Sequence, residues 1–209
     1  MQVLPNLEYM ETDFEEAQDL LPKYQMHRLK ELIILNLVEG IDLLYPFLYR
    51  MPNLEKLKLK FCRGSVRSTN IGRQERLGTV LQLKQLVLLN SYIEDLGFER
   101  NQVLQRLELL KLKEFNGLRN LGPSSVSLNC LKCLKLKNCQ ELRNLMASST
   151  GKSMVQLKTM KVIDCDEVEE IVSNEESEEG KVKKIVFSKL ISIELGAKEF
   201  EKFLQLQGV

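Results

Sequence analysis

The spacing of leucines in the middle of the chain constrains its fold more than any other feature. Residues 128–145 have the sequence LNCLKCLKLKNCQELRNL, with leucine at 128, 131, 134, 136, 142 and 145 and a cysteine at 139. An amphipathic helix repeats apolar residues at i, i+3, i+4 and i+7, whereas a half-buried strand alternates strictly. This segment takes steps of three, then a step of two, then steps of three again. Neither element alone explains the pattern.

The same spacing recurs along the chain. Residues 104–121, LQRLELLKLKEFNGLRNL, match the first segment at an offset of 24 residues, with Phe115 where Cys139 stands. Further units align forward over 154–171 and 187–195, and backward over 83–96, 54–62 and 29–37; the start, LPNLE, echoes the MPNLE at 51–55. Unit lengths from about twenty to the low thirties are typical of leucine-rich repeats.

A repeat unit of this kind accounts for the mixed spacing. In the L-x-x-L-x-L part, a short strand sends alternate leucines inward, and the chain then turns into a return arm. No unit can bury its leucines alone, so stacked units share one continuous core. We therefore predict an α/β repeat solenoid, a leucine-rich repeat horseshoe with a parallel concave β-sheet and mostly irregular or 3₁₀ convex arms.

One position in each unit, here called the turn slot, follows the strand. A small polar or thiol side chain at this position can meet backbone groups of the neighbouring coil. We predict a structural role for these side chains, with serine and phenylalanine as variants of cysteine. The turn slot is occupied by Cys62, Ser91, Phe115, Cys139 and Cys165.

The repeats organise the chain as a single domain, residues 1–209, of about seven to eight repeats. The pattern is weak over 1–28 and clear over 29–195, and two polar segments, 63–78 and 173–184, have the composition of inserted loops. Neither end carries a convincing polar cap, which a solenoid needs. We therefore expect the chain to be a fragment of a larger receptor.

Composition excludes several classes of function. The net charge is +1, so bulk charge favours neither a nucleic-acid binder nor an acidic tail. No apolar run approaches the length of a membrane span, and the N-terminus lacks the features of a signal peptide. Five cysteines, an odd number, fit free thiols in a reducing compartment.

Motifs for nucleotide, metal and catalysis are weak. Gly151, Lys152 and Ser153 form only the end of a phosphate-binding loop, since Met146 stands where its first glycine is required, and the preceding segment is expected to be a return arm. The single histidine, His27, has no triad arrangement around it. We predict no catalytic activity and no cofactor.

Four of the cysteines invite a comparison with zinc sites. Cys130, Cys133, Cys139 and Cys165 would have to converge to bind the metal. The repeat alignment instead points Cys133 outward and Cys139 and Cys165 into successive turns, so we expect the four to diverge. The prediction is free structural thiols and no metal.

The repeat alignment places lysines on the outward side of the concave sheet, with acidic residues only at Glu31 and Glu194 toward the ends. Such a basic stripe would attract an acidic partner surface. The alternative is that exposed strand lysines only keep the sheet soluble. Few aromatic residues accompany the lysines, which disfavours nucleic acid. The predicted partner-binding stripe comprises Lys56, Lys58, Lys60, Lys111, Lys113, Lys135, Lys137 and Lys161.

Four segments carry a resemblance to a known family: LPNLE, MPNLEKLKLKFC, LKCLKLKNCQELRNL and LKTMKVIDCDEVEEIV. They resemble the leucine-rich repeat region of plant intracellular disease-resistance proteins of the coiled-coil NB-ARC class. The form L-x-x-L-x-L-x-x-C-x-x-L, with an acidic insertion after E-E-I-V, carries the similarity. It covers nearly the whole chain and is best from Leu54 to Ile171.

The resemblance implies a cytoplasmic recognition module, with the nucleus possible. It would sense a pathogen effector or a modified host protein, and restrain an NB-ARC nucleotide-binding domain that this sequence does not contain. An alternative is a substrate-recruiting repeat domain of an F-box ubiquitin ligase, which also places cysteine in the turn slot. The residues that follow Cys139 and Cys165 differ from the usual pattern of that class, and no F-box-like segment precedes the repeats.

Overall fold

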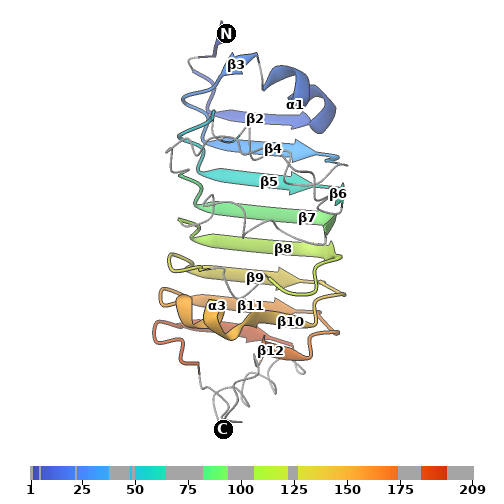
Figure 1. Ribbon diagram of the computed structural model, residues 1–209, viewed down its shortest axis with the longest axis vertical. Coiled ribbons are helices and arrows are strands. Elements are labelled where there is room, and N and C mark those ends of the chain that lie inside the picture. The colour runs from blue at the N-terminus through green and yellow to red at the C-terminus, as the bar shows by residue number, and fades with distance from the viewer. Residues whose placement is uncertain are drawn as a thin grey trace.

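The chain forms a stack of coils that runs from the N-terminus to the C-terminus along one axis (Figure 1). This computed structural model describes residues 2–4, 6–21, 23–37, 48, 50–64, 82–93, 106–121, 127–173 and 185–196. The predicted inserted loops lie largely outside the described residues. Of the first, only Arg63–Gly64 are described, as the short strand β6; of the second, only Ser173, which ends a strand.

A parallel sheet forms one side of the stack, as the leucine spacing predicts. Its order is β13-β11-β9-β8-β7-β5-β4-β2, and β6 pairs with β7 beside this path. Each coil adds one strand next to the strand of the coil before it. The strands are β2 (Tyr9–Asp13), β4 (Glu31–Leu35), β5 (Lys56–Lys60), β7 (Gln85–Ile93), β8 (Leu109–Asn116), β9 (Cys133–Lys137), β11 (Thr159–Ile163) and β13 (Ser192–Leu195).

The register of the sheet brings equivalent leucines of successive units together. Leu57 pairs with Leu86, and Leu110 with Leu134. These residues and their equivalents from Leu32 to Met160 are buried in one continuous core. Because burying a leucine side chain contributes about 1.5–3 kcal/mol, this ladder is the main source of stability. The predicted solenoid with a parallel sheet is confirmed.

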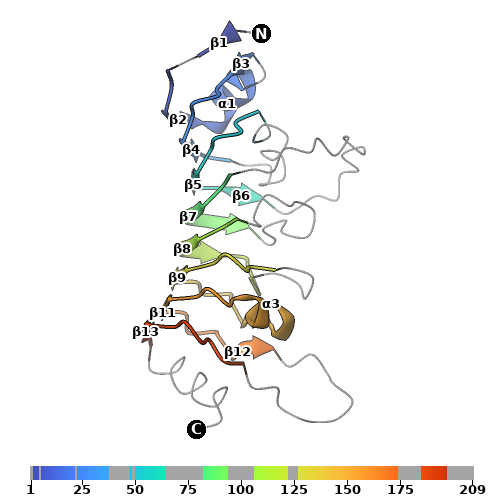
Figure 2. The same ribbon diagram turned by 90° about the vertical axis from the view of Figure 1, so that its left-hand side faces the viewer.

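Where the structure describes the return arms, on the far side of the core, they carry little regular structure (Figure 2). A small second sheet pairs β10 (Asn144–Ala147) with β12 (Glu170–Ser173), and helix α3 (Ser148–Ser153) follows β10 directly. Near the N-terminus, helix α1 (Phe14–Leu20) follows β2, and β1 (Gln2–Val3) pairs with β3 (Tyr24–Gln25). No 3₁₀ helix occurs among the described residues. No helix in that part of the chain is long and apolar enough to cross a membrane.

A left-handed residue explains how the chain turns into the arm; it directly follows β4, β5, β9 and β11 and lies within β7 and β8. In the fifth strand, Leu59 points inward, so strict alternation would also send Phe61 inward. Instead Phe61 has φ 57° and is 56% exposed, and the next residue, Cys62, is fully buried. The positive φ thus reverses the alternation and brings the turn slot into the core. The same conformation recurs at Asn36, Phe61, Asn90, Glu114, Asn138 and Asp164, here called the left-handed column.

A second column marks the start of each strand. The carbonyl of Lys30 accepts the backbone N–H groups of both Glu55 and Lys56 in the next coil, and the carbonyl of Glu55 accepts two in turn. From Glu8 to Lys132 the side chains in this column alternate in sign and pair between coils. The ion pairs are Lys30–Glu8 at 3.0 Å, Lys84–Glu55 at 2.8 Å and Lys132–Glu108 at 2.9 Å. Each of these six charged side chains is therefore neutralised by a side chain of opposite charge in an adjacent coil.

Candidate protein-binding face

The parallel sheet forms one side of the stack (Figure 2), and its face turned away from the core is here called the open face. The predicted lysines lie on this face. The strand register arranges its side chains in three rows. Because neighbouring strands lie about 4.8 Å apart, residues in one row are within reach of each other. The middle row consists of Glu11, Ile33, Lys58, Val87, Lys111, Lys135, Lys161 and Glu194.

All eight lysines of the predicted stripe lie on the open face. Strand β5 contributes Lys56, Lys58 and Lys60. Strands β8, β9 and β11 contribute the other five, which are Lys111, Lys113, Lys135, Lys137 and Lys161. Whether these lysines bind a partner is a separate question, which depends on how many of them are already neutralised.

Five of the eight lysines have a carboxylate within 4 Å. Two of these carboxylates, Glu31 and Glu194, are the ones that the sequence identified. Three others, Glu11, Glu114 and Asp164, were missed, so the face is less basic than the sequence indicated. The pairs are Lys56–Glu31 at 2.7 Å, Lys60–Glu11 at 2.9 Å, Lys113–Glu114 at 3.0 Å, Lys137–Asp164 at 3.8 Å and Lys161–Glu194.

Two of the missed carboxylates are held by several partners. The hydroxyl of Tyr9 donates to Glu11 at 2.6 Å, and this bond, followed by the one from Lys60, lowers the pKa of Glu11. On β8, in the middle of the sheet, the bond from Lys113 lowers the pKa of Glu114, with a smaller contribution from Asn90. Both groups therefore stay ionised and neutralise the lysines beside them.

Lys58, Lys111 and Lys135 have neither a hydrogen bond nor an ion pair among the described residues. Lys111 lies directly beside Lys135, and Lys135 lies directly beside Lys161. Like charges opposite each other on adjacent strands destabilise a sheet. The free positive charge of the open face is therefore concentrated in the middle row.

The turn slot forms a ladder of its own in the core. All five predicted residues are buried. The Cys62 thiol lies 3.5 Å from the carbonyl of Lys60, and the N–H of Cys62 donates to the Oγ of Ser91 at 3.1 Å. Ser91 Oγ donates in turn to the carbonyl of Leu89 at 2.8 Å. These side chains thus satisfy backbone groups of their own coil and of the coil before it.

Burial raises the pKa of the Cys62 thiol to about 11. The pKa of Cys139 is also raised, first by a hydrogen bond with the Cys165 side chain and then by burial. Cys139 and Cys165 occupy successive turns, as the sequence predicted, and parallel stacking places these equivalent positions side by side. Cys133 lies on the open face, in register with Thr159. No three metal-binding side chains gather anywhere in the described ranges.

The Gly-Lys-Ser segment has the wrong setting for a phosphate-binding loop. A strand, β10, precedes it, contrary to the expectation of an irregular arm. However, Gly151, Lys152 and Ser153 lie within helix α3 itself, whereas a phosphate-binding loop precedes its helix. The Ser153 hydroxyl donates to the carbonyl of Thr150 at 2.6 Å and accepts the N–H of Leu128 at 2.8 Å. The Ser153 hydroxyl therefore connects two coils.

His27 is exposed, and its ring nitrogen lies 3.1 Å from the side-chain oxygen of Gln25.

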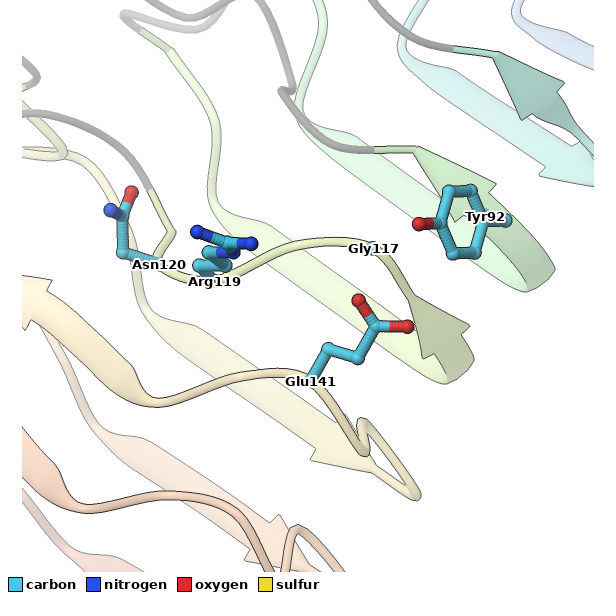
Figure 3. A pocket seen from close by; sticks show the side chains of 5 residues that line it. All are labelled: Tyr92, Gly117, Arg119, Asn120 and Glu141. Atoms are coloured by element: carbon cyan, nitrogen blue, oxygen red, sulfur yellow. The ribbon is translucent and has the colours of Figure 1, made fainter.

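A polar hollow of about 450 Å³ lies beside the ends of β7 and β8 (Figure 3). The Tyr92 hydroxyl and the Glu141 carboxylate are directed toward it, with the segment that carries Gly117 between them and Arg119 and Asn120 on the other side. These residues include no nucleophile paired with a base. The hollow therefore offers hydrogen bonds and charge but no arrangement for catalysis.

The comparison with protein families decides the class of this solenoid. The family model described as plant disease resistance protein RPS2-like, leucine-rich repeats, matches residues 4–166 and, in a second overlapping match, 119–199. The chain belongs to this family. Among curated proteins and among solved structures, no match was found. The family resemblance seen in the sequence is therefore confirmed. Leucine-rich repeats of this family are interaction modules.

The residue that the sequence did not single out is Phe61. It stands in the left-handed column, where the other members are asparagine, aspartate or glutamate. Phe61 directly follows β5 and is exposed, so its aromatic ring lies at the rim of the open face. Aligning the repeats by their leucines would have shown one apolar residue in an otherwise polar column, but its meaning depends on the backbone conformation.

Proposed function

We propose that the chain is a non-catalytic protein-recognition module of a plant immune receptor. It senses a pathogen effector or a modified host protein, and it restrains a nucleotide-binding domain until then. The module acts inside the cell, in the cytoplasm or the nucleus, as one part of a larger receptor. Family membership supports this function over substrate recruitment by an F-box ligase.

The observation that carries this proposal is the charge of the open face. Lys58, Lys111 and Lys135 lie in one row, and none of them has a carboxylate within 4 Å among the described residues. A row of unneutralised positive charge on a rigid sheet attracts an acidic surface and accelerates its encounter. A sheet that needed only solubility would be served equally well by neutralised lysines.

The test uses the full chain and a receptor N-terminal half of the same family, containing the coiled coil and nucleotide-binding domain. Both are expressed together in leaf tissue, and co-precipitation and cell death are measured. We expect the wild-type chain to bind and suppress cell death. Changing Lys58, Lys111 and Lys135 to Glu should weaken both effects, and the loss of binding should be larger at low salt than at high salt.

A matched control changes Lys23, Lys152 and Lys189 to Glu. These exposed lysines lie outside the open face, and their substitution alters the net charge by the same amount. We expect this variant to bind like the wild type. Equal loss in both triple variants would mean that binding depends on bulk charge, and no loss in either would show that the lysines only keep the sheet soluble.

A further inference from the structure

Two positions on the open face are locally unfavourable for folding, and both lie at the surface. The first is Phe61. With φ 57° it occupies the left-handed region, which asparagine and aspartate tolerate and bulky residues avoid. Four other members of the column, Asn36, Asn90, Asn138 and Asp164, follow this preference.

Glu114 departs from the preference too, but its carboxylate is bound to Lys113 and Asn90. The Phe61 ring has no comparable contact among the described residues and is 56% exposed. Neither the backbone nor the core therefore explains a phenylalanine at this position. Strained residues of this kind concentrate at ligand-binding sites.

The second unfavourable position is Lys135. It stands between Lys111 and Lys161 in the middle row, so it faces a like charge on each side. Of the three, only Lys161 is neutralised, by Glu194. An anionic group bound over Lys111 and Lys135 would remove this repulsion, because it would neutralise both ammonium groups at once.

The sheet fixes the relation between these two features. Phe61 directly follows β5, Lys58 lies within β5, and β8 and β9 lie two and three strands farther along. At about 4.8 Å per strand, Lys111 and Lys135 lie roughly 10–15 Å from β5. Leu35 and Leu89 flank Lys60 in the row next to Phe61, which gives the rim an apolar floor.

We infer that Phe61 is the anchor of a docking site for a partner-protein segment that presents an apolar side chain beside carboxylates. The apolar side chain packs on Phe61, Leu35 and Leu89, and the carboxylates pair with Lys58, Lys111 and Lys135. This inference rests on the proposed function and specifies the chemistry of the partner. Aromatic residues, phenylalanine included, are enriched at protein interfaces, and the unpaired lysines farther along the sheet supply complementarity to the carboxylates.

The test pans a displayed library of random 12-residue peptides against the full chain, and measures the affinity of synthesised winners by calorimetry. We expect winners to combine an aromatic or aliphatic residue with two or more carboxylates. Phe61→Asn should weaken their binding roughly tenfold or more, as for a hot-spot residue, while Phe61→Tyr should stay within about threefold. Lys111→Gln combined with Lys135→Gln should also weaken it, and Tyr92→Asn, a control aromatic beside the polar hollow, should not.

Thermal unfolding supplies a readout that a purely structural role would not give. Phe61→Asn should raise Tm, because asparagine suits the left-handed conformation, even though the same change weakens binding. A lower Tm for Phe61→Asn would show that the ring supports the fold and would overturn the strain argument. Peptides that bind Phe61→Asn and wild type equally well would place the site elsewhere and overturn this inference, while leaving the proposed function intact.

Two further outcomes also count against the inference. If no peptide is enriched although the receptor N-terminal half still binds, the proposed function stands and the Phe61 site falls. A single-stranded dT oligonucleotide serves as a polyanion probe. If it binds more tightly than any acidic peptide and depends on the lysines but not on Phe61, the site takes nucleic acid and not a protein segment.

Discussion

The backbone N–H of Cys62 donates to the Oγ of Ser91, which lies 29 residues later in the chain and one coil along the stack, at a distance of 3.1 Å. Both residues are buried. A buried N–H without a partner costs free energy comparable to a lost hydrogen bond. The turn slot therefore holds the stack together through a polar contact in an apolar core.

Replacing Ser91 with alanine should reveal this contact. The change leaves the N–H of Cys62 unsatisfied, so we expect the free energy of unfolding to fall by about 1–3 kcal/mol. Ser91→Cys should cost less, because a thiol fills the same slot in the preceding coil at Cys62 and in a later coil at Cys139. Urea denaturation followed by circular dichroism measures both variants; equal losses would show that volume matters more than the hydrogen bond.

The thiols should differ sharply in their reactivity in the folded protein. Cys62, Cys139 and Cys165 are buried, whereas Cys130 and Cys133 are partly exposed. We expect iodoacetamide at mild alkaline pH to label Cys130 and Cys133 first and the other three only after unfolding, because labelling requires an accessible thiolate. Mass spectrometry of time points locates the label. Early modification of Cys62 would contradict the burial of the turn slot.

The stability of the solenoid should fall at alkaline pH through Cys62. Burial raises its pKa from 9.0 to about 11, so the folded state holds this proton more tightly than the unfolded state. The resulting stabilisation is complete below pH 9 and is lost as pH rises toward 11. By linkage the loss amounts to at most about 3 kcal/mol.

Two variants isolate this contribution. Cys62→Ala and Cys62→Ser carry no titrating group at this position, so both should show a shallower decline of the free energy of unfolding between pH 9 and pH 11 than the wild type. Urea denaturation at a series of pH values provides the comparison. A decline as steep in both variants as in the wild type would assign the effect to other groups.

The fold could be predicted from the sequence because its stability comes from a periodic set of buried side chains. The spacing of Leu131, Leu134 and Leu136 predicts both the strand and the face of it that points into the core. The same spacing recurs in the next coil. Periodicity also predicted the turn slot, because a left-handed residue precedes each of its five buried members. The family resemblance rested on these same positions.

The charge of the open face was predicted less well, for a physical reason. Glu11 pairs with Lys60 across two strand steps, from β2 past β4 to β5, and the two residues are 49 positions apart in the chain. Such pairs depend on which residues of different coils lie side by side. The coils differ in length, so the spacing of leucines within a coil does not predict these neighbours. Glu114 and Asp164 were missed because a left-handed backbone, and not alternation, directs their side chains toward neighbouring lysines.

The position of a leucine or isoleucine in the stack should determine the cost of its removal. Leu134 is fully buried between strands on both sides, whereas Ile193, at the equivalent position of the last described strand, is 36% exposed. We expect Leu134→Ala to reduce the free energy of unfolding by about 3–4 kcal/mol and Ile193→Ala by about 1 kcal/mol or less. Chemical denaturation of both variants tests this, and similar losses would mean that the C-terminal coil is as well packed as the centre.

Gly117 should tolerate no side chain, because two separate constraints act on it. Its φ of +91° is a conformation that L-residues rarely adopt, and an added Cβ would lie 3.2 Å from the Ile93 carbonyl carbon and 3.2 Å from Tyr92 Cε1. We expect Gly117→Ala to reduce the free energy of unfolding by about 2–3 kcal/mol, measured by urea denaturation. Gly151→Ala is the matched control: it lies in helix α3, where alanine is favoured, and its new Cβ would meet the movable end of Ile185 at 3.0 Å. Its change should stay within about 1 kcal/mol. If Gly117→Ala reduced the free energy of unfolding as little as Gly151→Ala, the gap between Gly117 and the coil that carries Tyr92 and Ile93 would have to be wider than these distances.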